Sequence, residues 1–176
     1  DVKDGEVLFD PYNNNMLKRK VDDYLIQWKN NPDRLPLVIK GARQIGKTFS
    51  VRNFAKNYKN YIEINFITDP QFKTIFKNGY SPESIIKEIT LLKPEWEFIP
   101  NETLILFDEI QVFPDCTTCL KFFKLDGKYD VICSGSLLGI NYNQITSVSV
   151  GYKTDYEMYS LDFEEFLWAK GYKQEQ

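Results

Sequence analysis

The segment from Gly41 to Thr48 constrains the fold of this 176-residue chain more than any other feature. It follows the pattern glycine, four variable residues and Gly-Lys-Thr. The short apolar run from Leu37 to Ile39 precedes it, and apolar residues at helical spacing follow from Lys47 to Tyr58. A strand, a glycine-rich loop and a helix in this order present backbone N–H groups that can wrap a phosphate. The sequence therefore predicts a phosphate-binding loop.

Each residue type in this loop has a physical task. Gly41 and Gly46 allow backbone angles and a close approach that a side chain would block. Lys47 would reach the β- and γ-phosphates, and the Thr48 hydroxyl would coordinate Mg²⁺. We expect the loop and the residue after it to contact the nucleotide: Gly41, Ala42, Arg43, Gln44, Ile45, Gly46, Lys47, Thr48 and Phe49.

A second polar feature follows the apolar run from Thr103 to Phe107, which ends in Asp108 and Glu109. Strand ends in open α/β sheets lie beside the ligand crevice. On this interpretation Asp108 holds the magnesium shell and Glu109 polarises the attacking water, which favours hydrolysis over binding alone. The alternative is that both acids are simply solvated at a strand terminus. The phosphate loop upstream favours the functional interpretation.

The next apolar run also ends in small polar residues, at Ser134, Gly135 and Ser136. A hydroxyl in this place can report the γ-phosphate by hydrogen bonding, so Ser134 and Ser136 are further candidate catalytic residues. A strand-to-loop turn, however, uses serine and glycine for its own geometry. The sequence leaves both interpretations open.

The remaining hydrophobic patterns predict an alternation of strands and helices. The run from Leu104 to Phe107 is continuous rather than alternating, which indicates a strand covered on both faces and hence a parallel sheet. We therefore expect a three-layer α/β domain with a mostly parallel central sheet. The other expected helices are 17–28, 82–92 (with Ser81 as N-cap), 116–125 and 163–169, and the other expected strands are 61–66, 129–133 and a strand pair within 147–158.

The composition excludes several classes of enzyme. The chain contains no histidine, which rules out a Ser-His-Asp triad, a Cys-His pair and histidine-based zinc sites within it. Its three cysteines are an odd number, which favours a reducing cytoplasm over a disulfide framework. Cys116 and Cys119 form a Cys-x-x-Cys pair, but a zinc site would need a carboxylate as well, so core packing is the favoured interpretation.

Charge and hydropathy limit the partners. A formal net charge of −3 gives no basic field that would attract nucleic acid or an anionic membrane surface. No stretch approaches the roughly 18 apolar residues of a membrane span, and no basic start leads into an apolar signal core. We expect a soluble, cytoplasmic protein.

Arginine is confined to the first part of the chain, at Arg19, Arg34, Arg43 and Arg52. Nucleotide and sugar kinases close an arginine-bearing lid over the transferred phosphate, so this distribution argues against a phosphotransferase. An arginine finger would have to come from a neighbouring subunit or from missing sequence, or be replaced by a lysine such as Lys153. The favoured alternative for Lys153 is an ordinary surface lysine.

The pattern along the chain also suggests its boundaries. Residues 1–15 are polar and turn-rich, as expected of an N-terminal arm or leader, and Met16 is a candidate start. We expect residues 16–172 to form one ordered domain, residues 173–176 to be a tail, and the chain to be a fragment of a longer protein.

Several motifs, in this order, resemble those of prokaryotic AAA-type ATPases. They are the loop 41–48, the Leu-Phe-Asp-Glu-Ile-Gln run from Leu106 to Gln111, and the Ser-Gly-Ser-Leu-Leu segment 134–138. Later segments of that group are matched by residues 150–153 and 161–167. The resemblance implies a RecA/AAA-like P-loop NTPase fold, normally followed by a C-terminal domain with a possible DNA-processing or regulatory role.

The resemblance also implies roles for individual residues. Lys47 and Thr48 would bind phosphate and magnesium, Asp108 and Glu109 would be the metal acid and the catalytic acid, and one of the two serines would be the sensor. Members of the group often place a basic residue directly after the glycine that corresponds to 151, whereas a tyrosine intervenes here. This departure leaves open which cation would act between subunits of an oligomer.

Together these observations predict a protein that binds ATP with Mg²⁺ and hydrolyses it to drive conformational change. A C-terminal effector domain, a protein partner or a homo-oligomer would receive that change. One alternative is a nucleotide-sensing interaction module that binds ATP with little turnover, and a phosphotransferase is the third. Adenine is preferred over guanine through the resemblance and Glu109, because the chain lacks an Asn-Lys-x-Asp string that would read guanine.

Overall fold

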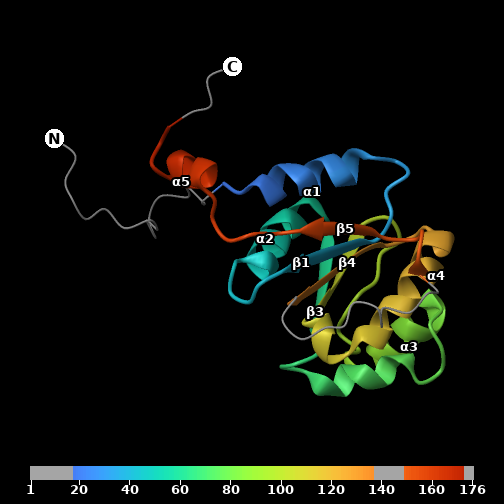
Figure 1. Cartoon of the computed structure of the whole chain (residues 1–176). Coiled ribbons are helices and arrows are strands. Elements are labelled where there is room, and N and C mark those ends of the chain that lie inside the picture. Colours follow the sequence, from blue (N-terminus) through green and yellow to red (C-terminus); the bar gives the residue numbers. More distant parts are fainter. Residues whose placement is uncertain (1–17, 137–148, 173–176) are drawn as a thin grey trace.

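The structure, a computed structural model, describes residues 18–136 and 149–172 and has a five-stranded parallel sheet at its centre (Figure 1). The order of the strands is β2-β3-β4-β1-β5, and all four pairings are parallel. The expected three-layer α/β fold with a mostly parallel sheet is therefore confirmed. The strands are β1 Leu37–Gly41, β2 Asn60–Asn65, β3 Thr103–Asp108, β4 Asp130–Ser136 and β5 Thr154–Glu157.

Helices cover both faces of the sheet. Helices α1 and α2 pack on one face and α3 and α4 on the other, and α5 lies at the edge of the domain near the start of α1 (Figure 1). The helices are α1 Lys20–Asn30, α2 Lys47–Phe54, α3 Pro82–Leu92, α4 Cys119–Asp126 and α5 Phe163–Ala169, and short 3₁₀ segments occupy Ala55–Asn57, Pro70–Phe76, Ile110–Val112 and Pro114–Thr118.

Strand β1 explains why two cores form. Its alternate residues point to opposite faces, so Leu37 and Ile39 join the core under α1 and α2, whereas Val38 joins the core under α3 and α4. All three side chains are fully buried. This burial on both faces is the reason that the strands read as continuous apolar runs in the sequence.

Helices α3 and α5 have the expected bounds. The Ser81 hydroxyl accepts a hydrogen bond from the Ser84 amide at 3.2 Å, and Pro82 takes the first helical position. Helix α4 is shorter than expected, because Pro114–Thr118 forms 3₁₀ turns and the α-helix begins only at Cys119. The segment after α2 likewise tightens into a 3₁₀ turn from Ala55.

The prediction of a strand pair within 147–158 is wrong for the part of this segment that the structure describes. That part contains a single strand, β5. Gly151, at φ 82°, lies in a turn before this strand. β5 then adds to β1, with the Thr154 amide donating to Pro36 O at 2.8 Å and the Met158 amide to Lys40 O at 2.7 Å. β5 therefore pairs with β1 and not with a neighbouring strand in a local hairpin. Residues 147 and 148 lie outside the described residues, as do the expected arm 1–15, Met16, the start of the helix expected at 17–28, Leu137, Leu138 and the tail 173–176.

The three cysteines are all fully buried in the core under α3 and α4. Burial raises the pKa of the Cys116 and Cys119 thiols well above the ordinary value. Within residues 18–136 and 149–172, no cluster of three or more Cys, Asp or Glu side chains is arranged to hold a metal ion. No helix in the same ranges is both long and apolar enough to cross a bilayer.

Candidate functional site

The phosphate loop joins the end of β1 to the start of α2, at the carboxyl edge of the sheet. Gly46 lies directly before α2 with φ 92°, a left-handed conformation that side chains disfavour. A Cβ atom at Gly41 would collide with the Met158 carbonyl and lie 2.6 Å from Ile45 Cδ1. Gly41 is therefore required by close packing, and Gly46 by its backbone conformation.

Lys47 is folded back onto this loop. Its ammonium donates to Gly41 O at 3.0 Å and to Ala42 O, and the residue is 9% exposed. Burial lowers the pKa of Lys47, although Glu109 and Asp108 oppose that shift. The ammonium thus lies inside the loop, at the helix N-terminus where anions bind.

Thr48 and Asp108 connect the phosphate loop to β3. The Thr48 hydroxyl donates to Asp108 Oδ2 at 2.6 Å, although the two residues are 60 positions apart. Burial raises the pKa of Asp108, and the hydrogen bonds from Thr48 and from the Glu109 amide partly offset this rise. A hydroxyl and a carboxylate at this distance are the hard oxygen ligands that Mg²⁺ takes, so the residues present fit a magnesium ion.

Glu109 follows β3 in a left-handed conformation, with φ 58° and ψ 42°. Its carboxylate accepts a hydrogen bond from Gln111 Nε2, and Gln111 Oε1 accepts one from the Ser136 amide at 3.1 Å. A Cβ at Gly135 would lie 2.8 Å from Ile110 Cγ1, so this glycine lets the Gln111 turn approach β4. Gln111 therefore joins the candidate catalytic acid to the end of β4.

Sequence reasoning assigned no role to Gln111. The available signal was an amide side chain three positions after Asp108, within the segment that resembles the AAA-type ATPases. Its partner Ser136 is 25 residues away, and only the pairing of β3 with β4 brings the two together.

Ser134 and Ser136 both lie at the same edge of the sheet as the phosphate loop. In the parallel register, Ser134 is opposite Asp108 on one side and Ile39 on the other, and Ser136 is opposite Gly41. The Ser134 hydroxyl is fully buried and has no hydrogen-bond partner among the described residues. Such a group is an uncommitted donor beside the candidate magnesium acid.

The other predicted nucleotide contacts differ in their surroundings. Arg43, Gln44 and Ala42 are exposed on the loop, and Phe49 is 53% exposed on the first turn of α2. The sheet therefore brings together Lys47, Thr48, Asp108, Glu109 and the two serines, whereas the side chains of Ala42, Arg43, Gln44 and Phe49 are exposed to solvent.

Lys153 lies far from the phosphate loop of its own chain. It directly precedes Thr154, which pairs with Leu37 at the beginning of β1, whereas the loop follows the end of that strand. Its ammonium is 2.7 Å from Asp155, and its side chain is 14% exposed. Within one chain, Lys153 thus acts as an ion-pair partner for Asp155 and not as a cation at the site.

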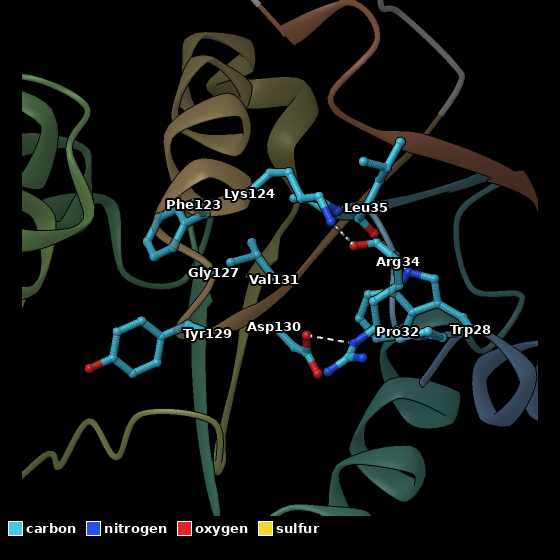
Figure 2. A pocket seen from close by; sticks show the side chains of 11 residues that line it. Trp28, Pro32, Arg34, Leu35, Phe123, Lys124, Gly127, Tyr129, Asp130 and Val131 are labelled. Atoms are coloured by element: carbon cyan, nitrogen blue, oxygen red, sulfur yellow. Dashed lines mark hydrogen bonds and ion pairs between the residues drawn. The ribbon is translucent and has the colours of Figure 1, made fainter. Parts of the chain in front are cut away.

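A cavity of about 150 Å³ opens near the amino-terminal ends of β1 and β4, opposite the phosphate loop (Figure 2). It is lined in part by Trp28, Arg34, Lys124 and Asp130. Arg34 Nε donates to Asp130 Oδ1 at 2.8 Å, and Lys124 donates to the carbonyl oxygens of Asp33 and Arg34. The charged side chains named here thus already have partners within the chain, and β1 separates the cavity from the phosphate loop.

Comparisons with known proteins agree with this fold. A family model described as an AAA domain matches residues 33–167. No curated protein matches the chain. A Walker-type ATPase of Pyrococcus abyssi has a similar structure at 17% identity, with a TM-score of 0.53 and coverage of 93% of this chain and 60% of that one.

Two further solved structures are similar at lower scores. Drosophila ORC bound to AT-rich DNA and Cdc6 is 10% identical, with a TM-score of 0.48 and coverage of 81% of this chain and 56% of that one. C. elegans PCH-2 is 12% identical, with a TM-score of 0.46 and coverage of 80% and 41%. The chain thus spans between about two fifths and three fifths of the length of these structures.

Proposed function

The chain belongs to the AAA domain family, and on this premise we propose that it binds ATP with Mg²⁺ and hydrolyses it to drive a conformational change. The observation that carries the proposal is the 2.6 Å hydrogen bond between Thr48 and Asp108. This bond joins the phosphate loop to the acid-bearing end of β3, which makes one composite site of two separate motifs.

Each side chain has a distinct part in this proposal. Thr48 and Asp108 hold the magnesium ion, which neutralises charge on the phosphates when it is bound. Lys47 exchanges its two carbonyl acceptors for phosphate oxygens. The Glu109 carboxylate takes a proton from water as the water oxygen attacks the γ-phosphorus, and the bond from that phosphorus to the bridging oxygen breaks to release ADP. The uncommitted Ser134 hydroxyl donates to the phosphate that is transferred.

Dependence on magnesium tests this function directly. We expect phosphate release from ATP to require Mg²⁺ and to fall to the background rate with excess EDTA, because the Thr48 and Asp108 oxygens act through the metal. Malachite-green detection of phosphate, with ATP and GTP run in parallel, provides the measurement, and ATP should be preferred. Metal-independent turnover would contradict the proposed site, and labelled phosphate on an acceptor molecule would indicate a phosphotransferase.

The second candidate is an ATP-binding module with little turnover, and the placement of the arginines favours it. Arg34 pairs with Asp130, Arg52 with Glu63, and Arg19 with Glu165. These three cations are thus occupied by carboxylates within the chain. Saturable ATP binding together with no phosphate release, from the longest form of the protein that contains this domain, would select this alternative.

We also propose that residues 16–172 act as one ATPase domain whose output passes to a further domain, a protein partner or other copies of the chain. The free, buried cysteines suit a reducing compartment such as the cytoplasm. In an oligomer, a neighbouring subunit would supply a further cation to the transferred phosphate, in addition to Lys47.

Gln111 provides a prediction about the catalytic acid. Replacing it with alanine removes the hydrogen bond that fixes the Glu109 carboxylate, so we expect kcat to fall about tenfold while KM stays unchanged. Gln27, exposed on α1, offers a control substitution of the same kind. Steady-state kinetics of Gln111→Ala and Gln27→Ala will show whether the fall in kcat is specific to Gln111. A rise in kcat for Gln111→Ala would show that the amide restrains Glu109 instead of positioning it.

A further inference from the structure

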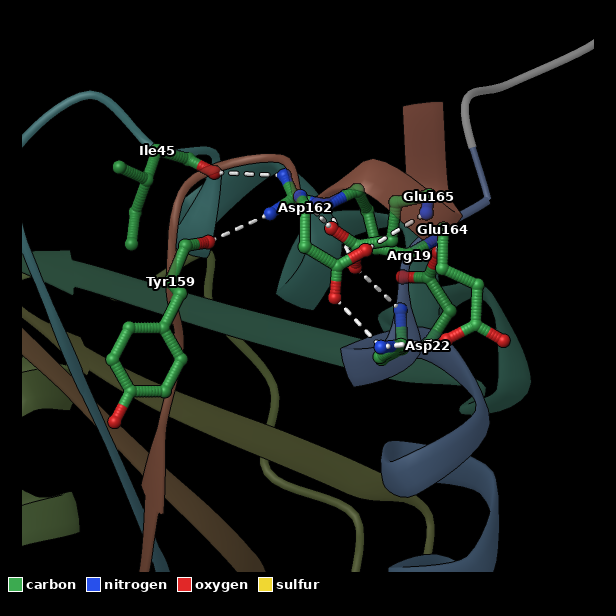
Figure 3. Close-up of polar contacts among 8 residues, drawn as sticks. Arg19, Asp22, Ile45, Tyr159, Asp162, Glu164 and Glu165 are labelled. Atoms are coloured by element: carbon green, nitrogen blue, oxygen red, sulfur yellow. Dashed lines mark hydrogen bonds and ion pairs between the residues drawn. The ribbon is translucent and has the colours of Figure 1, made fainter. Parts of the chain in front are cut away.

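Arg19, which directly precedes α1, contacts the phosphate loop (Figure 3). Its Nη1 donates to Ile45 O at 3.0 Å and its Nη2 donates to Tyr159 O at 2.8 Å. Its Nε lies 3.2 Å from Glu165 Oε1, and its side chain is 12% exposed. One guanidinium thus joins the phosphate loop, the segment after β5 and α5.

The contact with Ile45 fixes the direction of a phosphate-binding group. The Ile45 carbonyl and the Gly46 amide belong to one planar trans peptide, so C=O and N–H point in opposite directions. Because Arg19 holds the carbonyl, the Gly46 N–H points away from the guanidinium, where a phosphate bound in the loop can accept it. A charged donor on the carbonyl also polarises the peptide and strengthens its N–H as a donor.

Glu165 in turn holds Arg19 in place. In addition to this ion pair, its carboxylate accepts hydrogen bonds from the Lys20 amide at 2.8 Å and the Asp162 amide at 3.1 Å. These contacts lock the carboxylate at the junction of α1 and α5, where it is 5% exposed. The pairing of a nearly buried carboxylate with a nearly buried guanidinium leaves little freedom for either side chain.

Helix α5 contributes little else to the core. Glu165 is its only buried residue, whereas Phe163 is 75% exposed and Phe166 is 37% exposed. Lys20 adds ion pairs to Asp162 and Glu164 at 2.6 and 2.8 Å. The helix is therefore attached mainly by charged contacts centred on Arg19 and Lys20.

We propose that Arg19 is a positioning residue of the phosphate loop, and that Glu165 couples α5 to this loop by holding Arg19 in place. The proposal rests on the proposed function, because it concerns how the same site binds nucleotide phosphates. It has a reciprocal consequence. If α5 supports the loop through Arg19, phosphate bound in the loop must stabilise the docking of α5 by the same factor.

The test measures binding of ATP and of tripolyphosphate, which has neither base nor ribose, by calorimetry. Arg19→Lys keeps the charge but loses the fork that reaches two carbonyls, so we expect it to weaken both ligands by about tenfold or more. Glu165→Gln should weaken both by a smaller factor, and the two substitutions combined should be less than additive. Arg34→Lys makes the same change in a comparable arginine–carboxylate pair near the amino-terminal ends of β1 and β4, and it should leave both affinities unchanged.

Hydrogen exchange tests the reciprocal effect. ATP should slow exchange in the peptide that contains Phe163–Ala169 of the wild-type chain, and this protection should be lost in Glu165→Gln. Unchanged affinities in Arg19→Lys would overturn the proposal, as would weaker ATP binding with unchanged tripolyphosphate binding, since Arg19 would then serve the base. ATP binding without any protection of α5 would overturn the part assigned to Glu165. A wild-type chain that binds neither ligand would instead overturn the proposed function, and this inference with it.

Discussion

Replacing Lys47 with methionine is expected to weaken ATP binding by at least about a hundredfold and to abolish hydrolysis. The ammonium is enclosed by the loop, where it donates to two carbonyl oxygens beside the helix N-terminus. Methionine retains most of the length of the side chain but supplies no charge. Titration with a fluorescent ATP analogue and a phosphate-release assay will measure the two effects.

Thermal stability provides the control for this substitution. Burial lowers the pKa of Lys47 below that of the unfolded chain, so the folded state binds its proton less tightly and the charged form opposes folding. This penalty is fully present below the folded pKa and is relieved as the pH rises from the folded to the unfolded pKa. Lys47→Met removes the charge, so without nucleotide its melting temperature should equal or exceed that of the wild type. Retained ATP binding in a folded Lys47→Met variant would contradict the assigned site.

Replacing Glu109 with glutamine is expected to reduce the rate of hydrolysis by about a hundredfold to ten-thousandfold while ATP still binds. Glutamine has nearly the same shape and can still bond to Gln111, but it cannot accept a proton from water. The loss should therefore lie in kcat and not in affinity. Single-turnover hydrolysis and nucleotide titration of the same preparation will show whether the loss lies in the rate of hydrolysis or in the affinity for ATP.

Glu102→Gln is a matched control, because Glu102 pairs with Lys59 near the beginnings of β2 and β3, away from the site. It should retain wild-type turnover. If Glu109→Gln also retained it, Glu109 would not activate water, and another group would have to be sought. If Glu109→Gln lost affinity as well, the carboxylate would be holding the site together instead of acting in the reaction.

The parts of the fold that the sequence predicted well depend on local chemistry. The bounds of α3 follow from a serine cap and a proline at the first turn, and the phosphate loop follows from two glycines and a lysine at fixed spacing. The buried strands follow from continuous apolar runs. In each case, residues close in the chain determine the conformation.

Other parts depend on partners that are distant in the chain. The segment before Cys119 has a helical pattern, but Thr117 O and Thr118 O accept hydrogen bonds from Ser149, and the chain forms 3₁₀ turns there. The residues around Thr154 have a β-rich pattern that fits a hairpin equally well, yet the open edge of β1 takes the strand. A pattern shows that a segment forms a strand but does not show its neighbour.

The sequence by itself determined the loop, the chemistry of Lys47 and Thr48, and the presence of two acids at the end of a buried strand. Only the tertiary structure decided the strand order that sets Thr48 against Asp108, Gln111 against Ser136, and Arg19 against Ile45 and Tyr159. The last of these contacts spans 140 residues. The physical reason is that backbone conformation responds to neighbouring residues, whereas the direction of a charged side chain is set by whichever acceptor the packed sheet and helices bring within hydrogen-bond reach.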